Sequence, residues 1–460
     1  MAHYARMSAA PRSPAPSFLV GGEALERFSY YGVTSALVLY LNEHLLYPER
    51  DAKAHYHAFL AAAWLAPLVG AWLADRLRVR YRATLGVVVA WASVLGLAVL
   101  AAFESRAGLA VGLALVVLGA GATKPSISGF VGDPLRAGDG PARARANGWL
   151  AGAVNGAAVL AALLVPALLV AFGPRVAFAV PAGALALARV VLRAGRARPV
   201  LPAPARRDPH GFLRVVARAL SRLGTGHPGQ HWLDLARDVH PPEAVEGAKA
   251  VLRIGAVFAA VTLFWALFDQ KGSAWVFQAR QMDLAIAGRQ LSPAQLQAAS
   301  PLLAVVLVPL LGAVVFPALA RRGVAPSPLA RMSAGMFAAV LSFAAAAIVQ
   351  TLVDAGHAPH ALWQLPQYLL LAVGEVLVSV TGLELSFTQA PRTMRSTVMS
   401  IWFLTVFGGN LLTALVGQLV RLEGAAWFWF FAAVMLAGTL VFRAIARVWR
   451  VARAEEIVAE

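Results

Sequence analysis

The chain has 460 residues, of which 59% are hydrophobic and 14% charged, and its mean hydropathy is +0.66. Apolar runs recur along nearly its whole length, which excludes a soluble globular protein and predicts an all-α polytopic membrane protein embedded in a lipid bilayer. The formal net charge of +17 comes from arginines in short loops rather than from a separate basic domain, so no nucleic-acid partner is expected.

About twelve apolar segments are each long enough for a helix that crosses a bilayer, which takes about 20 residues. Residues 1–17 precede them as a polar cytoplasmic tail, without the apolar core of a signal peptide. The expected spans are residues 18–41, 56–75, 83–103, 107–132, 147–172, 174–193, 250–270, 297–319, 329–353, 362–389, 393–419 and 424–446.

A long polar stretch divides these spans into two halves. Residues 194–249 form a cytoplasmic linker between two six-helix bundles at 18–193 and 250–446, and residues 447–460 form a cytoplasmic C-terminal tail. Within the linker, residues 211–223 combine apolar positions at helical spacing with a basic opposite face. This pattern predicts a lateral amphipathic helix on an anionic membrane surface.

Arginines gather in alternate loops, in the linker and near the C-terminus. By the positive-inside rule both termini are cytoplasmic, and we expect a multi-pass protein of the cell inner or plasma membrane. Six plus six helices with a cytoplasmic linker is the plan of the major facilitator fold, whose site lies between the halves near the membrane midplane.

The first span contains an unusual charge cluster. Glu23, Glu26 and Arg27 share one helical face, and Tyr30 continues it. A charge at membrane depth costs roughly 2.5–3.5 kcal/mol, so the cluster needs a reason. It is either a self-neutralising structural ion cluster or a site in a water-filled cavity, where Arg27 keeps carboxylates ionised and a proton or substrate competes for them.

Other spans also contain charges. Lys124 is followed by proline in an apolar stretch, so it is not part of a phosphate loop. We expect it to pair with Glu23 or Glu26, unless its side chain merely snorkels to the interface. Glu375 in the tenth span needs a cation, either Lys271 or a substrate amine.

Two kinds of residue leave structural and functional interpretations open. Trp265 and Trp402 fit packing or interface aromatics as well as a pocket. His57, at the expected outer start of the second span, could titrate near physiological pH or be polar decoration at a helix end. The sequence contains no metal-ligand cluster and no catalytic constellation, so we expect neither an enzyme nor a cofactor beyond the proton as coupling ion.

These residues together resemble the proton-dependent oligopeptide transporter family (POT or PTR2) of the major facilitator superfamily. The signature Glu-x-x-Glu-Arg-Phe-x-Tyr-Tyr-Gly is complete at residues 23–32, and Lys124-Pro125 with Gly132-Asp133 is similar to the fourth-helix motif. Residues 264–270 and 374–391 are similar to the seventh- and tenth-helix motifs, and the placement of His57 resembles the animal branch.

The resemblance implies proton symport of di- and tripeptides by alternating access, and it implies a role for each matching residue. The proton-coupling set is Glu23, Glu26, Arg27, Lys124 and His57. The substrate-binding set is Tyr30, Tyr31, Asn155, Trp265, Glu375, Trp402 and Asn410. The gate consists of Lys271, Glu375 and Asp269.

The chain departs from the family at four positions. Thr34 stands where the family has an arginine that engages the peptide carboxylate and the seventh-helix acid, here Asp269. The other departures are Ala151 for a tyrosine, Ser300 for an asparagine, and Gly312 for the acidic partner of Arg253.

Two further functions stay open at this point. Thr34 and Ala151 motivate a proton-coupled transporter of an anion or a small non-peptide metabolite on the same fold. The basic linker motivates a non-transporting membrane sensor or scaffold.

Overall fold

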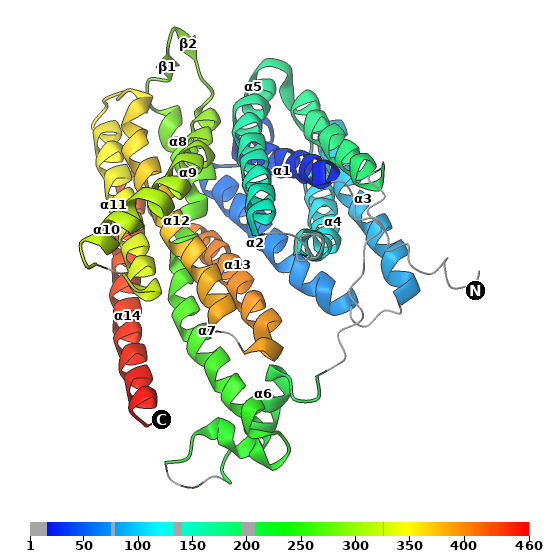
Figure 1. Cartoon of the computed structure of the whole chain (residues 1–460). Helices are drawn as coiled ribbons and strands as arrows, with labels where there is room; N and C mark the ends of the chain where they lie inside the picture. Colours follow the sequence, from blue (N-terminus) through cyan, green and yellow to red (C-terminus); the bar gives the residue numbers. More distant parts are fainter. Residues whose placement is uncertain are drawn as a thin grey trace. The chain divides into compact units, whose positions relative to one another are not determined.

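The computed structural model describes residues 16–459, except 75–78, 133–139, 195–207 and the single positions 226, 228, 325 and 390. The first part contains α1 (Pro16–Leu39), the π-turn η2 (Tyr40–His44), α2 (Glu49–Ala74), α3 (Val79–Ala102), α4 (Arg106–Gly132) and α5 (Gly140–Ala194). The linker contains α6 (Phe212–Ser221) and the 3₁₀ turn η3 (Trp232–Asp238) (Figure 1).

The remaining helices are α7 (Pro242–Phe268), α8 (Ala274–Arg280), α9 (Ala299–Pro309), α10 (Phe316–Arg321), α11 (Pro328–Asp354), α12 (Leu365–Thr388), α13 (Arg395–Leu419) and α14 (Gly424–Ala459). Short turns join them: η4 (Asp269–Gly272), η5 (Pro293–Ala298), η6 (Leu310–Val315), η7 (Ala361–Gln364) and η8 (Arg392–Met394). Strands β1 (Ala285–Ile286) and β2 (Arg289–Gln290) pair antiparallel, with Ala285 opposite Gln290.

Eight helical segments of the described chain are long and apolar enough to cross a membrane. One of them, Gly148–Ala194, has two arms, because α5 reverses at Gly173 with φ +75°, a conformation open to glycine. The eight segments, the second arm of α5, the charged α1 and the shorter apolar segments of α3 and α4 together account for the twelve spans. The predicted all-α membrane fold is confirmed.

Several helix boundaries differ from the predicted ones, including three at polar helix ends. α2 begins at Glu49 rather than at residue 56, α7 begins at Pro242 rather than 250, and α14 continues to Ala459 rather than 446. Acidic residues lie in the first turns of α2 and α7, where the positive end of the helix dipole stabilises their negative charge. Apolar periodicity identifies only the part of a helix that crosses the membrane, so it misses such polar turns.

The described chain forms two compact units. One comprises the residues up to Tyr40 and those from Val69 to the end of α5, and the other comprises Leu41–Leu68 and the chain from the linker onward. The sequence places Leu41–Leu68 in the first six-helix half, whereas packing places it with the second unit. The boundary therefore crosses α2 directly after Leu68, the residue that follows Pro67, a proline inside the helix.

The second unit has a core rich in aromatic side chains. Trp275, Tyr368 and Phe343 are fully buried, and the rings of Trp275 and Tyr368 meet edge to face at 4.8 Å. Burying one such side chain contributes about 1.5–3 kcal/mol. This packing joins α8 to α11 and α12, and α8 follows directly on the short turn η4, which contains Asp269 and Lys271.

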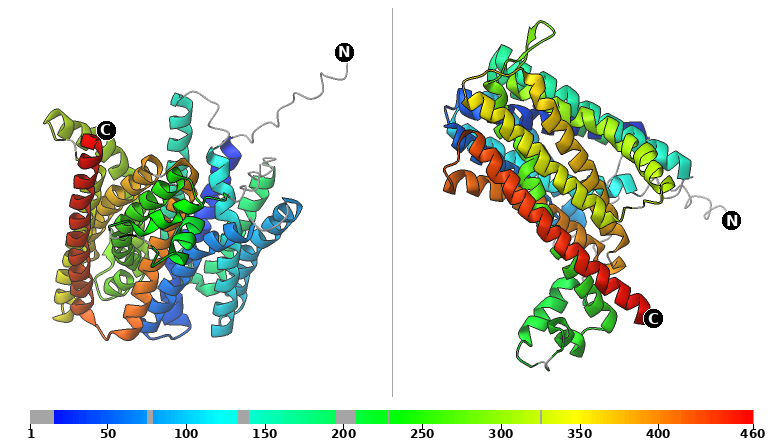
Figure 2. Two further views of the ribbon diagram at one scale, coloured as in Figure 1. Left: turned by 90° about the horizontal axis from the view of Figure 1, so that it is seen from below. Right: turned by 90° about the vertical axis from the view of Figure 1, so that its left-hand side faces the viewer.

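The linker packs as a small module at the end of α7 remote from the β1–β2 hairpin (Figures 1 and 2). Val215 and Ala219 of α6 and Leu233 of η3 are fully buried. Leu213 and Leu220 remain exposed, at 76% and 51%. Some apolar residues of α6 are thus buried inside the module, while others are exposed on its surface. The docking of α6 on a membrane stays a prediction.

Candidate functional site

The two acids of α1 each bind a guanidinium. Arg27 Nε donates to Glu23 Oε1 at 2.7 Å within the helix, and Arg189 Nη1, from the second arm of α5, donates to Glu26 Oε2 at 3.0 Å. Glu23 Oε2 is buried and has no hydrogen-bond partner among the described residues. Neutralisation of the acids is therefore shared between α1 and α5, a pairing that the sequence does not predict.

The remaining candidates of the first unit lie on α1, α4 and α5. Tyr30 and Tyr31 are adjacent, with ring centroids 5.4 Å apart, and Tyr31 is exposed. Asn155 Nδ2 donates to the carbonyl of Ala151, one turn earlier in α5, so this amide hydrogen is used inside the helix. Lys124 lies on α4, and its side chain is outside the described part of the chain, so its predicted carboxylate pairing stays a prediction.

His57 joins a buried polar network in the second unit. Its Nδ1 lies 2.8 Å from Asn410 Oδ1, and its Nε2 lies 2.8 Å from Ser273 Oγ. Because Asn410 Nδ2 donates to Asp269 Oδ2 at 2.6 Å, the amide oxygen faces His57 and accepts from Nδ1–H. Nε2 then accepts from the Ser273 hydroxyl. His57 is 1% exposed and not at the start of α2, so the interpretation as polar decoration is wrong.

The expected gate residues lie on η4 and α12. Lys271 Nζ donates to Ser300 Oγ at 3.0 Å and lies 3.2 Å from the centroid of the Phe268 ring. Glu375 and Asp269 both interact with Lys271 through charge. Ser300, which the sequence shows only as a departure from the family pattern, thus accepts a hydrogen bond from Lys271. Asn410 donates one to Asp269.

The two tryptophans pack together. Trp265 on α7 and Trp402 on α13 meet edge to face, with centroids 6.0 Å apart, and both are at least nine-tenths buried. The indole N–H of Trp265 is buried without a hydrogen-bond partner in the described chain. The two indoles therefore pack against each other, and the Trp265 N–H is unpaired among the described residues.

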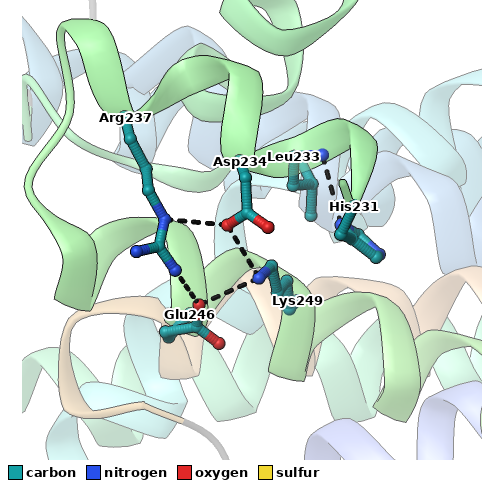
Figure 3. Close-up of polar contacts among 6 residues, drawn as sticks. All are labelled: His231, Leu233, Asp234, Arg237, Glu246 and Lys249. Atoms are coloured by element: carbon teal, nitrogen blue, oxygen red, sulfur yellow. Dashed lines mark hydrogen bonds and ion pairs between the residues drawn. The ribbon is translucent and has the colours of Figure 1, made fainter. Parts of the chain in front are cut away.

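A second charged cluster lies on the linker module (Figure 3). Asp234 accepts from Arg237 Nε and pairs with Lys249 Nζ, both at 2.8 Å, and Glu246 binds the same two cations at 2.6 and 2.9 Å. Burial raises the pKa of Asp234, but Lys249 and Arg237 outweigh it, so its pKa lies below the usual value. The cluster ties η3 to the first turns of α7.

Sequence reasoning missed three residues that contact the candidates: Arg189, Ser273 and Ser300. Arg189 could have been found by the argument applied to Lys124, since it is a cation inside an apolar span. Its position four residues before the expected end of that span makes it resemble an interface arginine. The two serines carry no such signal, because a hydroxyl in a membrane helix can bond its own backbone.

The fold and the buried acids, cations and histidine within its spans define a membrane protein of the major facilitator type. A model of the POT family (PTR2) matches residues 84–429, and the chain belongs to this family.

Relatives and solved structures agree with this assignment. The chain is 31% identical over 369 residues to solute carrier family 15 member 1 of Mus musculus, covering 73% of this chain and 52% of that one. It is 33% identical over 356 residues to peptide transporter family 1 of Drosophila melanogaster, with coverages of 73% and 47%. The chain spans about half the length of the curated relatives it matches.

Two crystal structures match over nearly the whole chain. The POT family transporter PepTSo superposes with a TM-score of 0.88 at 32% identity, covering 96% of this chain and 99% of that one. An auto-inhibited POT family peptide transporter superposes with a TM-score of 0.84 at 34% identity, covering 95% and 97%.

Proposed function

We propose that the protein is a proton-coupled symporter that imports di- and tripeptides by alternating access. It lies in the cell inner or plasma membrane with both termini in the cytoplasm. The relatives named as peptide transporters support the substrate class, and the alternating arginine-rich loops support the orientation.

The observation that carries the proposal is the pair of acids on α1. Glu23 and Glu26 lie in a membrane helix, and each binds one guanidinium. An ion pair at membrane depth is expensive to keep and marks proton or substrate pathways. Protonating one acid removes its attraction for the arginine, which can then bind a substrate carboxylate.

The other candidates take roles consistent with this scheme. The residues that would contact the peptide are Tyr30, Tyr31, Asn155, Trp265, Trp402 and Asn410. Glu375 would bind its amino terminus, with Lys271 and Asp269 as charges of the gate. The scheme needs protons and a lipid bilayer, and no cofactor.

Uptake into proteoliposomes tests the proposal. An inward proton gradient should drive accumulation of a labelled dipeptide, and Glu26→Gln should abolish it. Glu423→Gln, at an exposed glutamate before α14, is the matched control and should accumulate normally. Equal uptake with and without the gradient would contradict proton coupling.

One observation favours a second candidate, a non-peptide anion or small metabolite as substrate. The Thr34 hydroxyl donates within its own helix, to the carbonyl of Tyr30 or Tyr31 at 3.1 and 3.2 Å, and so does not replace the arginine expected there. A thermal-shift screen separates the candidates, because a ligand at a hundredfold excess over its Kd stabilises by about 2.7 kcal/mol. Stabilisation by another class, with no di- or tripeptide active, would favour the second.

A further inference from the structure

The ion pair between Glu26 and Arg189 joins two elements of the first unit. Arg189 Nη1 lies 3.0 Å from Glu26 Oε2, and the two side chains are only 11% and 14% exposed. An ion that loses its partner in such a poorly exposed place is strongly destabilising. Separating the two charges inside the protein is therefore costly unless Glu26 is first neutralised.

The backbone brings the two groups together. Gly22 packs so closely on the second arm of α5 that an added Cβ would lie 2.5 Å from Leu192 Cδ2. This close approach occurs one residue before Glu23 and three residues after Arg189. A larger side chain at residue 22 would force α1 away from α5 and lengthen the pair.

The two carboxylates of α1 differ in how their pairs can break. Glu23 and Arg27 are four residues apart on one helix, so movement between elements leaves them adjacent. Glu26 and Arg189 lie on different elements, so a shift between α1 and α5, or protonation of Glu26, can separate them.

The charged groups that face Glu26 come from two described elements. Arg189 binds it directly from α5, and Arg27 interacts with it through charge from α1. Glu23 already occupies Arg27 at 2.7 Å. Lys124 on α4 is a further candidate, with a side chain outside the described part of the chain.

Resting on the proposed proton symport, we propose that Arg189 is a positioning residue of the proton-coupling site. It binds the Glu26 carboxylate in the unloaded carrier and is released when Glu26 takes up a proton. None of the family motifs quoted above contains Arg189.

The test compares Arg189→Gln with the unsubstituted protein in proteoliposomes. Removing the guanidinium takes away the cation that binds Glu26, so the pH of half-maximal uptake should rise. Release on the inside becomes harder, so gradient-driven accumulation should fall at least about tenfold, which corresponds to about 1.4 kcal/mol. Counterflow exchange, which needs no net proton release, should persist.

Two variants separate coupling from folding. Arg189→Lys keeps the charge and should retain the pH profile, so it remains informative if the glutamine variant fails to fold. Arg193→Gln removes an exposed arginine one turn further along α5 and should change neither measurement.

The outcomes distinguish the inference from the proposed function. No gradient-driven uptake by the unsubstituted protein would overturn proton symport itself. Normal uptake by that protein, with an unshifted pH profile in Arg189→Gln or with counterflow and accumulation reduced in equal proportion, would overturn the role of Arg189 and leave the symporter intact.

Discussion

Asn410 is the junction of the polar network in the second unit. Its oxygen accepts from His57, and its nitrogen donates to Asp269 at 2.6 Å and to the carbonyl of Val406 at 3.1 Å. An amide cannot pass on a proton, but its dipole lets a charge on the histidine be felt at the carboxylate. The network thus links an ionisable base on α2 to the acid at the end of α7.

Replacing this amide should uncouple the two groups. Asn410→Leu removes the partner of His57 Nδ1 and of Asp269 Oδ2, which costs about 1–3 kcal/mol for each buried group. We expect a lower Tm and loss of gradient-driven uptake. Thr413→Val, one turn later, removes the hydroxyl that donates to Ala266 O at 2.9 Å and should lower only the Tm. A comparable loss of uptake in both variants would argue against a special role for Asn410.

At the residue scale, the sequence predicts which groups carry charge inside the membrane but not all their partners. The motif positions on α1 could be identified because an acid in an apolar run is conspicuous. The contact between His57 and Asn410 spans 353 residues, and no periodicity reports such a pairing. Arg189 and Ser300 became visible as partners only when their helices were placed.

The linker is an element with its own polar organisation. His210 Nδ1 and His240 Nδ1 lie 3.0 Å apart, joining the segment just before α6 to the segment just after η3. Burial, and then the neighbouring His210, lower the pKa of His240. The folded linker therefore favours the neutral imidazole.

This direction predicts how the linker responds to acid. Stability from the neutral His240 is fully present above the ordinary pKa near 6.5 and is lost as the pH falls from there through the lowered pKa of the folded state. Amide hydrogen exchange over residues 208–240, corrected for intrinsic rates, should therefore be less protected at pH 5.5 than at pH 7.5. His240→Gln should reduce this difference, and His357→Gln, in an exposed loop, should preserve it. Equal protection at both pH values would refute the prediction.

The start of α2 is fastened to the end of α13. Arg50 Nε donates to the carbonyl of Gly417 at 2.7 Å, Arg50 also binds the carbonyl of Gln418, and Gln418 Nε2 donates to Asp51 Oδ1 at 3.0 Å. These carbonyls belong to the last turn of α13, where the helix leaves acceptors unpaired and a cation is favourable. The contact therefore joins α2 to α13 within the second unit.

Because the chain has no native cysteine, this contact can be tested by cross-linking without background. If alternating access requires these helix ends to separate, joining Asp51→Cys to Gln418→Cys with a short bifunctional thiol reagent should stop dipeptide uptake. Each single-cysteine variant should be insensitive to the reagent. Undiminished uptake by the cross-linked double variant would show that the contact need not open.

At the scale of the whole molecule, composition and apolar periodicity sufficed to predict a helical membrane fold with about twelve spans. They could not predict the boundary between the two units, because packing along the length of α2 decides it. The two arms of α5 could be separated in the sequence at Gly173-Pro174, since this pair interrupts an otherwise continuous apolar run.

The orientation of the molecule gives a prediction independent of transport. Arg322→Cys, in the exposed loop after α10, should react with a membrane-impermeant maleimide only after cells are opened, because that loop is expected on the cytoplasmic side. Ala355→Cys, in the next loop, should react in intact cells. The reverse pattern would place both termini outside.

The position of Pro67 has a mechanical consequence for α2. A proline has no amide hydrogen to donate to the carbonyl four residues earlier, at Ala63, so a helix bends there at low cost. Since the boundary between the units falls directly after Leu68, one continuous helix begins in one body and ends in the other. α2 can then bend as a hinge, and the one missing hydrogen bond determines how easily it bends. Pro67→Ala would stiffen it, and the turnover rate should slow while the affinity for substrate stays the same.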